Sequence, residues 1–173
     1  MHDSRRTANL LGATALAVSD VLLAGATGAA GVSASGAAAL VLLDATPGLS
    51  VTELGRRVGL SQSAAARMVD SLEAAALAER RPGIGRWVTV HPTQAGRQTA
   101  HELLAARAAP LTDMVAGLDE NEQAALARLL AKLLTQIYGE VRNAQLICRL
   151  CDRAACMANA ACPVGAAERA QGR

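Results

Sequence analysis

Aromatic residues are almost missing from this sequence: it contains no phenylalanine, one tryptophan and one tyrosine among 173 residues, although 51% of them are hydrophobic. Alanine and leucine must therefore fill the core. Because alanine has the highest helix propensity, this composition predicts an all-α or mostly-α protein. At this length the chain fits one domain with an appendage and can bury a core of its own.

Lysine is scarce as well, since Lys132 is the only one, and the formal net charge is only +2. The charge is unevenly distributed: residues 50–100 hold seven arginines against four acidic residues, whereas residues 101–139 hold three basic and five acidic residues. A locally basic segment is typical of contact with a phosphate backbone, although a solvated surface of mixed charge gives the same pattern.

Catalytic motifs are absent from the sequence. The three histidines, His2, His91 and His101, belong to no nucleophile or metal motif, and no glycine-rich loop of the phosphate-binding kind occurs. Histidines that are solvated or hydrogen-bonded account for this pattern. We therefore expect that the protein is not an enzyme.

A long uninterrupted apolar run is also lacking, although two adjacent arginines near the N-terminus precede apolar residues, as in a twin-arginine signal. Asp20 interrupts these residues, and glycines divide residues 21–43, which poorly match the roughly 20 strongly apolar residues of a membrane span. We expect instead two core helices, Thr7–Ala26 and Ser35–Ala45, with a glycine and serine turn between them. The expected location is cytoplasmic, with no membrane contact.

Capping signals predict a pair of helices in the middle of the chain. Ser50 and Glu53 form an S-x-x-E capping box that opens a helix, and Gly59 ends that helix. Ser61 caps the following helix, which reaches about Ala76. Two short helices joined by a tight glycine-containing turn are the pattern of a helix-turn-helix, whose second helix enters the major groove.

A β-hairpin follows this helix pair directly. Residues 86–90 alternate and are rich in β-branched side chains, as in a strand, and Pro82-Gly83 supplies the turn that pairs them with residues 78–81. A hairpin in this position is a wing, and a guanidinium at its tip suits the negative potential of a narrow minor groove. The arginines at or beside the tip are Arg80, Arg81 and Arg86.

The last third of the chain is predicted to be helical again. One helix spans Thr93–Ala109 and is broken at Pro110, and a second begins after Asp119 and continues to about Leu150. At about 1.5 Å per residue the second helix is on the order of 45 Å long, too long for so small a lobe to cover. Its uncovered apolar stripe predicts a partner, most simply a second copy of the chain.

Three segments carry a family resemblance. Val51–Arg81 reads VTELGRRVGLSQSAAARMVDSLEAAALAERR, Thr93–Gly96 follows the wing, and Leu118–Glu122 opens the last helices. In order and spacing over about residues 8–140, the chain resembles the multiple-antibiotic-resistance regulator (MarR) family of winged-helix repressors. The resemblance implies a mostly α-helical winged helix-turn-helix with long N- and C-terminal dimerisation helices.

The resemblance divides the chain into four parts. Residues 1–34 hold an N-terminal dimerisation helix and its turn, 35–100 the DNA-binding lobe, 101–147 the C-terminal dimerisation helices, and 148–173 a cysteine tail. It implies a homodimeric transcriptional regulator, expected to be a repressor, that binds a pseudo-palindromic double-stranded DNA operator. A small-molecule effector is compatible with the family, but no pocket motif can be carried over.

The residues expected to contact DNA lie in the helix pair and the wing, because glutamine reads adenine edges and arginine reads guanine or phosphate. They are Thr52, Ser61, Gln62, Ser63, Arg67, Arg81 and Arg86. The sequence departs from the family pattern twice. Gly85 stands where an aspartate usually precedes the wing arginine, and Ala76 stands where a glycine usually follows the recognition helix.

Cysteine is absent from the first 147 residues and concentrated in the last 26, as Cys148-x2-Cys151-x4-Cys156-x5-Cys162-Pro163. Four thiols match the coordination number of both zinc and an iron–sulfur cluster. We favour iron–sulfur over zinc, because only one Cys-x-x-Cys pair occurs. A thiol–disulfide switch and inert packing are the alternatives. Cys148 and Cys151 are expected on one face at the end of the last helix, which the chain must leave near Asp152 for all four thiols to converge.

These patterns together predict a DNA-binding regulator that senses metal or redox state through its cysteines. The alternative is a small electron-transfer protein with a cysteine-ligated metal or redox centre and no DNA binding. Such a protein has no use for a wing, so DNA binding by the purified protein separates the two.

Overall fold

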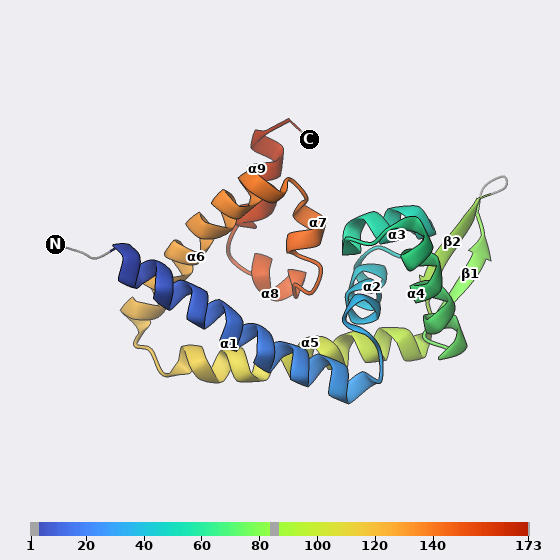
Figure 1. Ribbon diagram of the computed structural model, residues 1–173, viewed down its shortest axis with the longest axis horizontal. Helices are drawn as coiled ribbons and strands as arrows, with labels where there is room; N and C mark the ends of the chain where they lie inside the picture. Colours follow the sequence, from blue (N-terminus) through green and yellow to red (C-terminus); the bar gives the residue numbers. More distant parts are fainter. Residues whose placement is uncertain (1–3, 84–86, 173) are drawn as a thin grey trace.

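The computed structural model describes residues 4–83 and 87–172, with the side chains of residues 23–30 left out of the description. A lobe that contains the two strands lies at one end of the molecule, and α6 to α9 lie together with α7 facing α3 of the lobe (Figure 1). The elements in chain order are α1 (Ser4–Ala30), α2 (Ala34–Ala45), α3 (Val51–Val58), α4 (Gln62–Ala74), β1 (Ala78–Pro82), β2 (Val88–Pro92), α5 (Gln94–Ala116), α6 (Glu120–Val141), α7 (Ala144–Ile147), α8 (Arg153–Met157) and α9 (Pro163–Ala170).

Helix α2 forms the centre of the lobe. Every residue from Gly36 to Leu43 is buried, so the helix is apolar on all sides and must be surrounded. Helices α3, α4 and α5 and strand β2 pack around it. As the composition predicts, the large buried side chains of the lobe are aliphatic: Leu40, Leu42, Leu43, Leu54, Leu72, Val69 and Val90.

The helix-turn-helix and the wing are confirmed. Helices α3 and α4 occupy the predicted positions, although α4 ends at Ala74 rather than at Ala76. Strands β1 and β2 form a two-stranded antiparallel sheet in which Arg80 lies opposite Val90. The two helices near the N-terminus are also confirmed, with the turn between them at residues 31–33.

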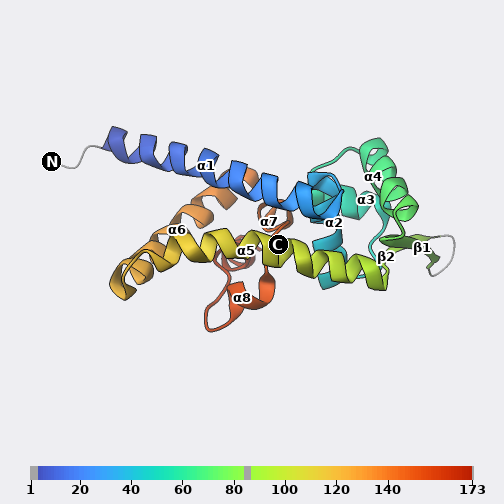
Figure 2. The same ribbon diagram turned by 90° about the horizontal axis from the view of Figure 1, so that it is seen from below.

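The predicted helix break at Pro110 is wrong, because α5 continues through this residue to Ala116. A proline removes one backbone hydrogen bond from a helix. Residues 105–109, Ala-Ala-Arg-Ala-Ala, are strong helix formers, and α1 packs along α5 (Figure 2). Propensity and packing together hold the helix across the proline.

Helix α6 is shorter than predicted, since it ends at Val141 rather than near Leu150. Arg142 takes a left-handed conformation with φ of 50°, and Asn143 caps the next helix by accepting a hydrogen bond of 3.0 Å from the N–H of Leu146. Asparagine is a strong N-cap and a poor helix former, a signal that the periodicity of the apolar residues conceals. The chain therefore turns back well before the first cysteine.

The tail forms a second, smaller core against α6. Tyr138, Ala144 and Val164 are buried at its centre, and Cys148 and Cys162 pack against them. Figure 1 shows α7 and α9 beside the C-terminal half of α6. The four-cysteine segment is thus a folded part of the protein.

Helix α1 is not the core helix that the sequence predicts. Its large apolar side chains are exposed in the single chain, with Leu16 at 72%. None of the described helices combines the length and the apolar character that crossing a membrane requires.

Ala76 has a φ of 57°, in the left-handed region that residues with a Cβ avoid. We predict that Ala76→Gly raises the free energy of unfolding by about 1 kcal/mol, because glycine adopts this conformation without steric penalty. Ala74→Gly, at the end of α4, is the control and should lower it by about 0.5–1 kcal/mol. Urea denaturation measures both, and a destabilised Ala76→Gly protein would contradict the prediction.

Candidate nucleic-acid interface and cysteine cluster

Small residues set the packing of α3 against α4. A Cβ on Gly55 would lie 2.6 Å from the Cβ of Ala65, so the two helices approach as closely as glycine permits. Gly59 turns the chain with a φ of 78°, and the Oγ of Ser61 accepts a hydrogen bond of 3.4 Å from the N–H of Ala64. The orientation of α4 is therefore fixed by its contacts with α3.

The predicted DNA-contacting residues of the helix pair all lie on the surface. Thr52, on α3, is exposed, and so are the residues at the start of α4, namely Ser61, Gln62, Ser63 and Arg67. The opposite face of α4 is buried in the lobe through Ala65, Met68, Val69 and Leu72. The hydroxyl of Ser61 already accepts a hydrogen bond from the backbone of α4, because Ser61 caps that helix.

Most arginines of the basic segment are paired within the protein. Arg56 and Arg57 both donate to Glu53, at 2.8 and 2.7 Å, and hydrogen bonds from Arg56, more than any other interaction, lower the pKa of Glu53 to about 2. The capping carboxylate expected at Glu53 thus turns to these two arginines. Arg67 has no ion pair within the described part of the chain. Its guanidinium is left for a partner outside the protein.

Arg80 ties the wing to α4. Its guanidinium donates to Asp70 at 2.8 Å and also to Glu73, and its backbone N–H donates to Glu73 at 2.7 Å. These bonds occupy Arg80, which sequence reasoning had placed beside the tip as a groove-binding side chain. They fix the base of the wing relative to α4 instead.

The outer part of the wing is exposed. Arg81 pairs with Glu79 at 2.5 Å on the surface of β1, and Trp87, the one tryptophan of the chain, is 75% exposed. Arg86 and Gly85 lie outside the described residues.

The structure brings the four cysteines together at one cavity of about 290 Å³, which all of them line. The predicted placement of Cys148 and Cys151 at the end of the last long helix is wrong, because α6 ends at Val141. Cys148 follows α7, Cys151 precedes α8, Cys156 lies within α8, and Cys162 caps α9 by accepting a 3.4 Å hydrogen bond from the N–H of Gly165.

The four thiols are free and lie close together around the cavity. The neighbouring Cys151 lowers the pKa of Cys148, whereas burial, more than the neighbouring thiols, raises the pKa of Cys156 to about 11. In the described ranges no three Cys, His, Asp or Glu side chains surround a point that would hold a metal ion. The four sulfurs thus line one cavity without surrounding a common point.

The cysteine-bearing segment packs directly on the helix-turn-helix. Asn143 donates a hydrogen bond of 3.3 Å to the backbone oxygen of Arg56, at the end of α3. Leu146 covers Gly59, on which a Cβ would lie 2.9 Å from the Leu146 Cδ1. Leu150 joins the edge of the main core. Sequence reasoning missed this contact, because no local pattern records which distant surface a short helix covers.

The fold and these surfaces define a winged helix-turn-helix protein with an appended cysteine cluster. A family model described as "MarR family" matches residues 30–85. Residues 30–85 of this chain are thus similar to the MarR family. None of the curated proteins compared with it matches.

Solved structures extend the likeness over most of the chain. The YusO protein of Bacillus subtilis is 25% identical, with 77% of this chain and 97% of that chain covered and a TM-score of 0.67. A MarR-family transcriptional regulator of Silicibacter pomeroyi is 29% identical, with 75% and 89% covered and a TM-score of 0.57. FabT of Streptococcus pneumoniae, solved in complex with DNA, shares the fold at 17% identity, with 79% and 99% covered and a TM-score of 0.70.

Because the pKa of Glu53 is lowered from 4.5 to about 2, its ionised form stabilises the fold above pH 4.5, and this contribution is lost as the pH falls toward 2. We predict that Glu53→Gln destabilises the protein at neutral pH and that its difference from the wild type shrinks between pH 4.5 and 2. Urea denaturation at several pH values measures this difference. A difference that does not change with pH would show that the ion pairs with Arg56 and Arg57 contribute nothing to stability.

Proposed function

We propose that this protein is a sequence-specific transcriptional regulator that binds double-stranded DNA through α4 and the wing. The observation that carries the proposal is the exposed polar face at the start of α4, where Gln62, Ser63 and Arg67 stand on a helix whose other face is buried. Glutamine and arginine are the side chains best suited to adenine and guanine edges. The likeness to FabT, solved in complex with DNA, supports this use of the fold.

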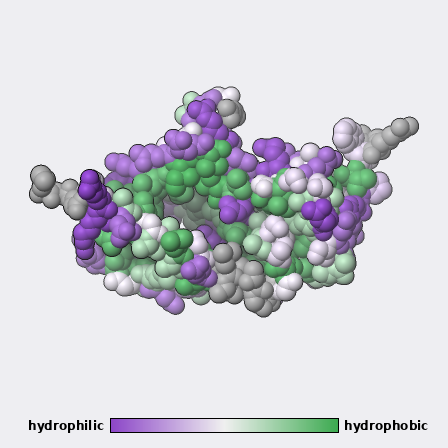
Figure 3. Space-filling model, in the orientation of Figure 1, coloured by the Kyte–Doolittle hydropathy of each residue, from purple (hydrophilic) through white to green (hydrophobic). Residues whose placement is uncertain are grey.

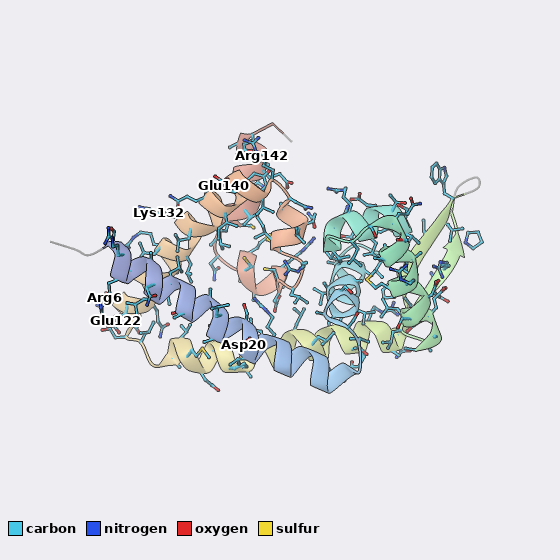
Figure 4. All side chains as sticks on the ribbon, viewed as in Figure 1. Arg6, Asp20, Glu122, Lys132, Glu140 and Arg142 are labelled. Carbon is cyan, nitrogen blue, oxygen red and sulfur yellow. The ribbon has the colours of Figure 1, made fainter. Side chains whose placement is uncertain are left out.

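The working unit is a homodimer. Large apolar side chains are exposed along three long helices: Leu10, Leu11, Leu16 and Val21 on α1, Met114 and Val115 on α5, and Leu129, Leu130, Ile137 and Val141 on α6. Figure 3 shows hydrophobic surface gathered over the α6 side of the molecule, while Lys132 and Glu140 extend outward from α6 in Figure 4. A second copy of the chain would cover these helices and place two α4 helices in successive major grooves, about 34 Å apart. Repression by occupying the operator is the mode that the family resemblance implies.

Arg67→Ala should weaken operator binding by about 1–3 kcal/mol if the guanidinium reads a base, or lower the salt slope by about one per site if it contacts phosphate. Arg97→Ala removes the same charge from the start of α5 and is the matched control. Fluorescence anisotropy with a labelled operator at several salt concentrations measures both. Equal effects of the two substitutions would mean that α4 does not contact the operator. No DNA binding by the wild type would instead favour an electron-transfer protein.

We also propose that Cys148, Cys151, Cys156 and Cys162 bind a metal centre, with an iron–sulfur cluster favoured over zinc. The donor set fits, because thiolates are the preferred ligands of both and the four side chains line one cavity. Binding would require the four thiols, which line the cavity without surrounding a common point, to move toward one centre. An iron–sulfur cluster would supply redox sensitivity, and zinc a structural link.

A change in metal state would affect the DNA-binding surface of the same chain. Cys148 ends α7, the helix whose Leu146 covers Gly59 at the turn between α3 and α4. A bound centre would hold α7 in this position, and its loss would free the turn to shift. Coupling of this kind needs one element that has two arrangements, which the two sites favour differently, and we propose α7 as that element.

Cys151→Ser should abolish metal binding and alter operator affinity together, as measured by elemental analysis and operator titration of protein purified without oxygen. Leu146→Ala is the companion variant: it should retain the metal but reduce the difference in affinity between loaded and metal-free protein. If metal is lost in Cys151→Ser while operator affinity stays the same, the tail is structural and senses nothing. Metal-free wild-type protein with four titratable thiols would favour the disulfide switch.

A further inference from the structure

Tyr138 carries a fully buried hydroxyl without a partner. The side chain is 0% exposed, and its hydroxyl forms no hydrogen bond with any of the described residues. Removing a hydroxyl from water without giving it a partner costs free energy, so buried hydroxyls in folded proteins are nearly always hydrogen-bonded. The unpaired group therefore implies that the hydroxyl gains a partner in another state of the protein.

Apolar packing does not account for this residue. Tyr138 is the single tyrosine of a chain whose core is otherwise built from alanine, leucine, valine and one methionine. An aliphatic side chain fills the equivalent buried places in the lobe at no polar cost. The hydroxyl is thus the feature that distinguishes this position.

Tyr138 packs in a hydrophobic cluster that includes two of the four cysteines. It lies at the centre of the second core with Ala144 and Val164, and both Cys148 and Cys162 pack against this core. The other partly buried hydrophobic residues packed there are Leu134, Ile147 and Ala167. Among these hydrophobic residues, the cysteines are the ones whose side chains can accept a hydrogen bond from the hydroxyl.

A neutral thiol is a weak acceptor, whereas a metal-bound thiolate carries negative charge and accepts more strongly. Ligands in metal sites are commonly oriented by hydrogen bonds from residues behind them. We infer that Tyr138 is a positioning residue of the metal centre, whose hydroxyl donates a hydrogen bond to the sulfur of Cys148 or Cys162 when the centre is bound. The inference rests on the proposed four-cysteine site.

The test titrates reduced, metal-stripped full-length protein with Co²⁺, whose thiolate complexes absorb light through sulfur-to-metal charge transfer. Tyr138→Phe should weaken Co²⁺ binding by about 10-fold or more and shift that absorption band, because the sulfur loses its hydrogen bond. Without metal, the same variant should be at least as stable to urea as the wild type, because an unpaired buried hydroxyl has been removed. A purely structural role would not produce these opposite effects.

Leu134→Val is the matched control, since it alters the packing of the same core without removing a polar group. It should lower stability and leave the absorption band unchanged. Wild-type affinity and spectrum in Tyr138→Phe would overturn the inference and leave the four-cysteine site standing. A destabilised metal-free Tyr138→Phe would also overturn it, because the hydroxyl would then have a partner without metal. Failure of the wild type to bind Co²⁺ would overturn both proposals.

Discussion

The contact between Leu146 and Gly59 joins the two halves of this protein. A Cβ on Gly59 would lie 2.9 Å from the Leu146 methyl carbon, and nearby Asn143 donates to the backbone oxygen of Arg56. Glycine suits this position for its left-handed φ of 78°, and the end of the Leu146 side chain packs against it. The turn that orients α4 is thus also the surface on which the cysteine-bearing segment rests.

The scarcity of aromatic side chains helps to explain why the winged lobe has a complete core and why other helices leave leucines exposed. Alanine and leucine let α2 be surrounded closely by other helices, so the winged lobe has a complete core within one chain. Helices α1 and α6 have no such cover and leave leucines exposed, which a second copy would bury. The two aromatic residues lie at opposite extremes: Trp87 is exposed on the wing, and Tyr138 is buried beside the cysteines.

Local signals in the sequence were sufficient for the DNA-binding lobe. The caps Ser50 and Ser61 and the glycine between them mark the two helices, and the alternation after Pro82 marks the wing. Packing between distant parts of the chain determined the features that these local signals did not predict. Helix α5 passes through Pro110 because α1 lies along it, and Arg80 is held by α4 instead of reaching outward.

For the tail, cysteine spacing predicted that the four thiols would gather but not where. The prediction placed Cys148 and Cys151 at the end of the helix that begins after Asp119. The N-cap at Asn143 ends that helix early and turns the tail toward α3. Which surface a short helix covers depends on the whole fold, and no residue pattern within the tail specifies it.

Amide hydrogen exchange in metal-loaded and metal-stripped protein tests most directly whether the cysteine cluster braces the helix-turn-helix. Exchange protection reports local opening, residue by residue. The account predicts that stripping the metal lowers protection in α7 and in α3 up to Gly59, while the buried amides of α2 remain protected. Unchanged protection in α3, with losses confined to α8 and α9, would contradict it.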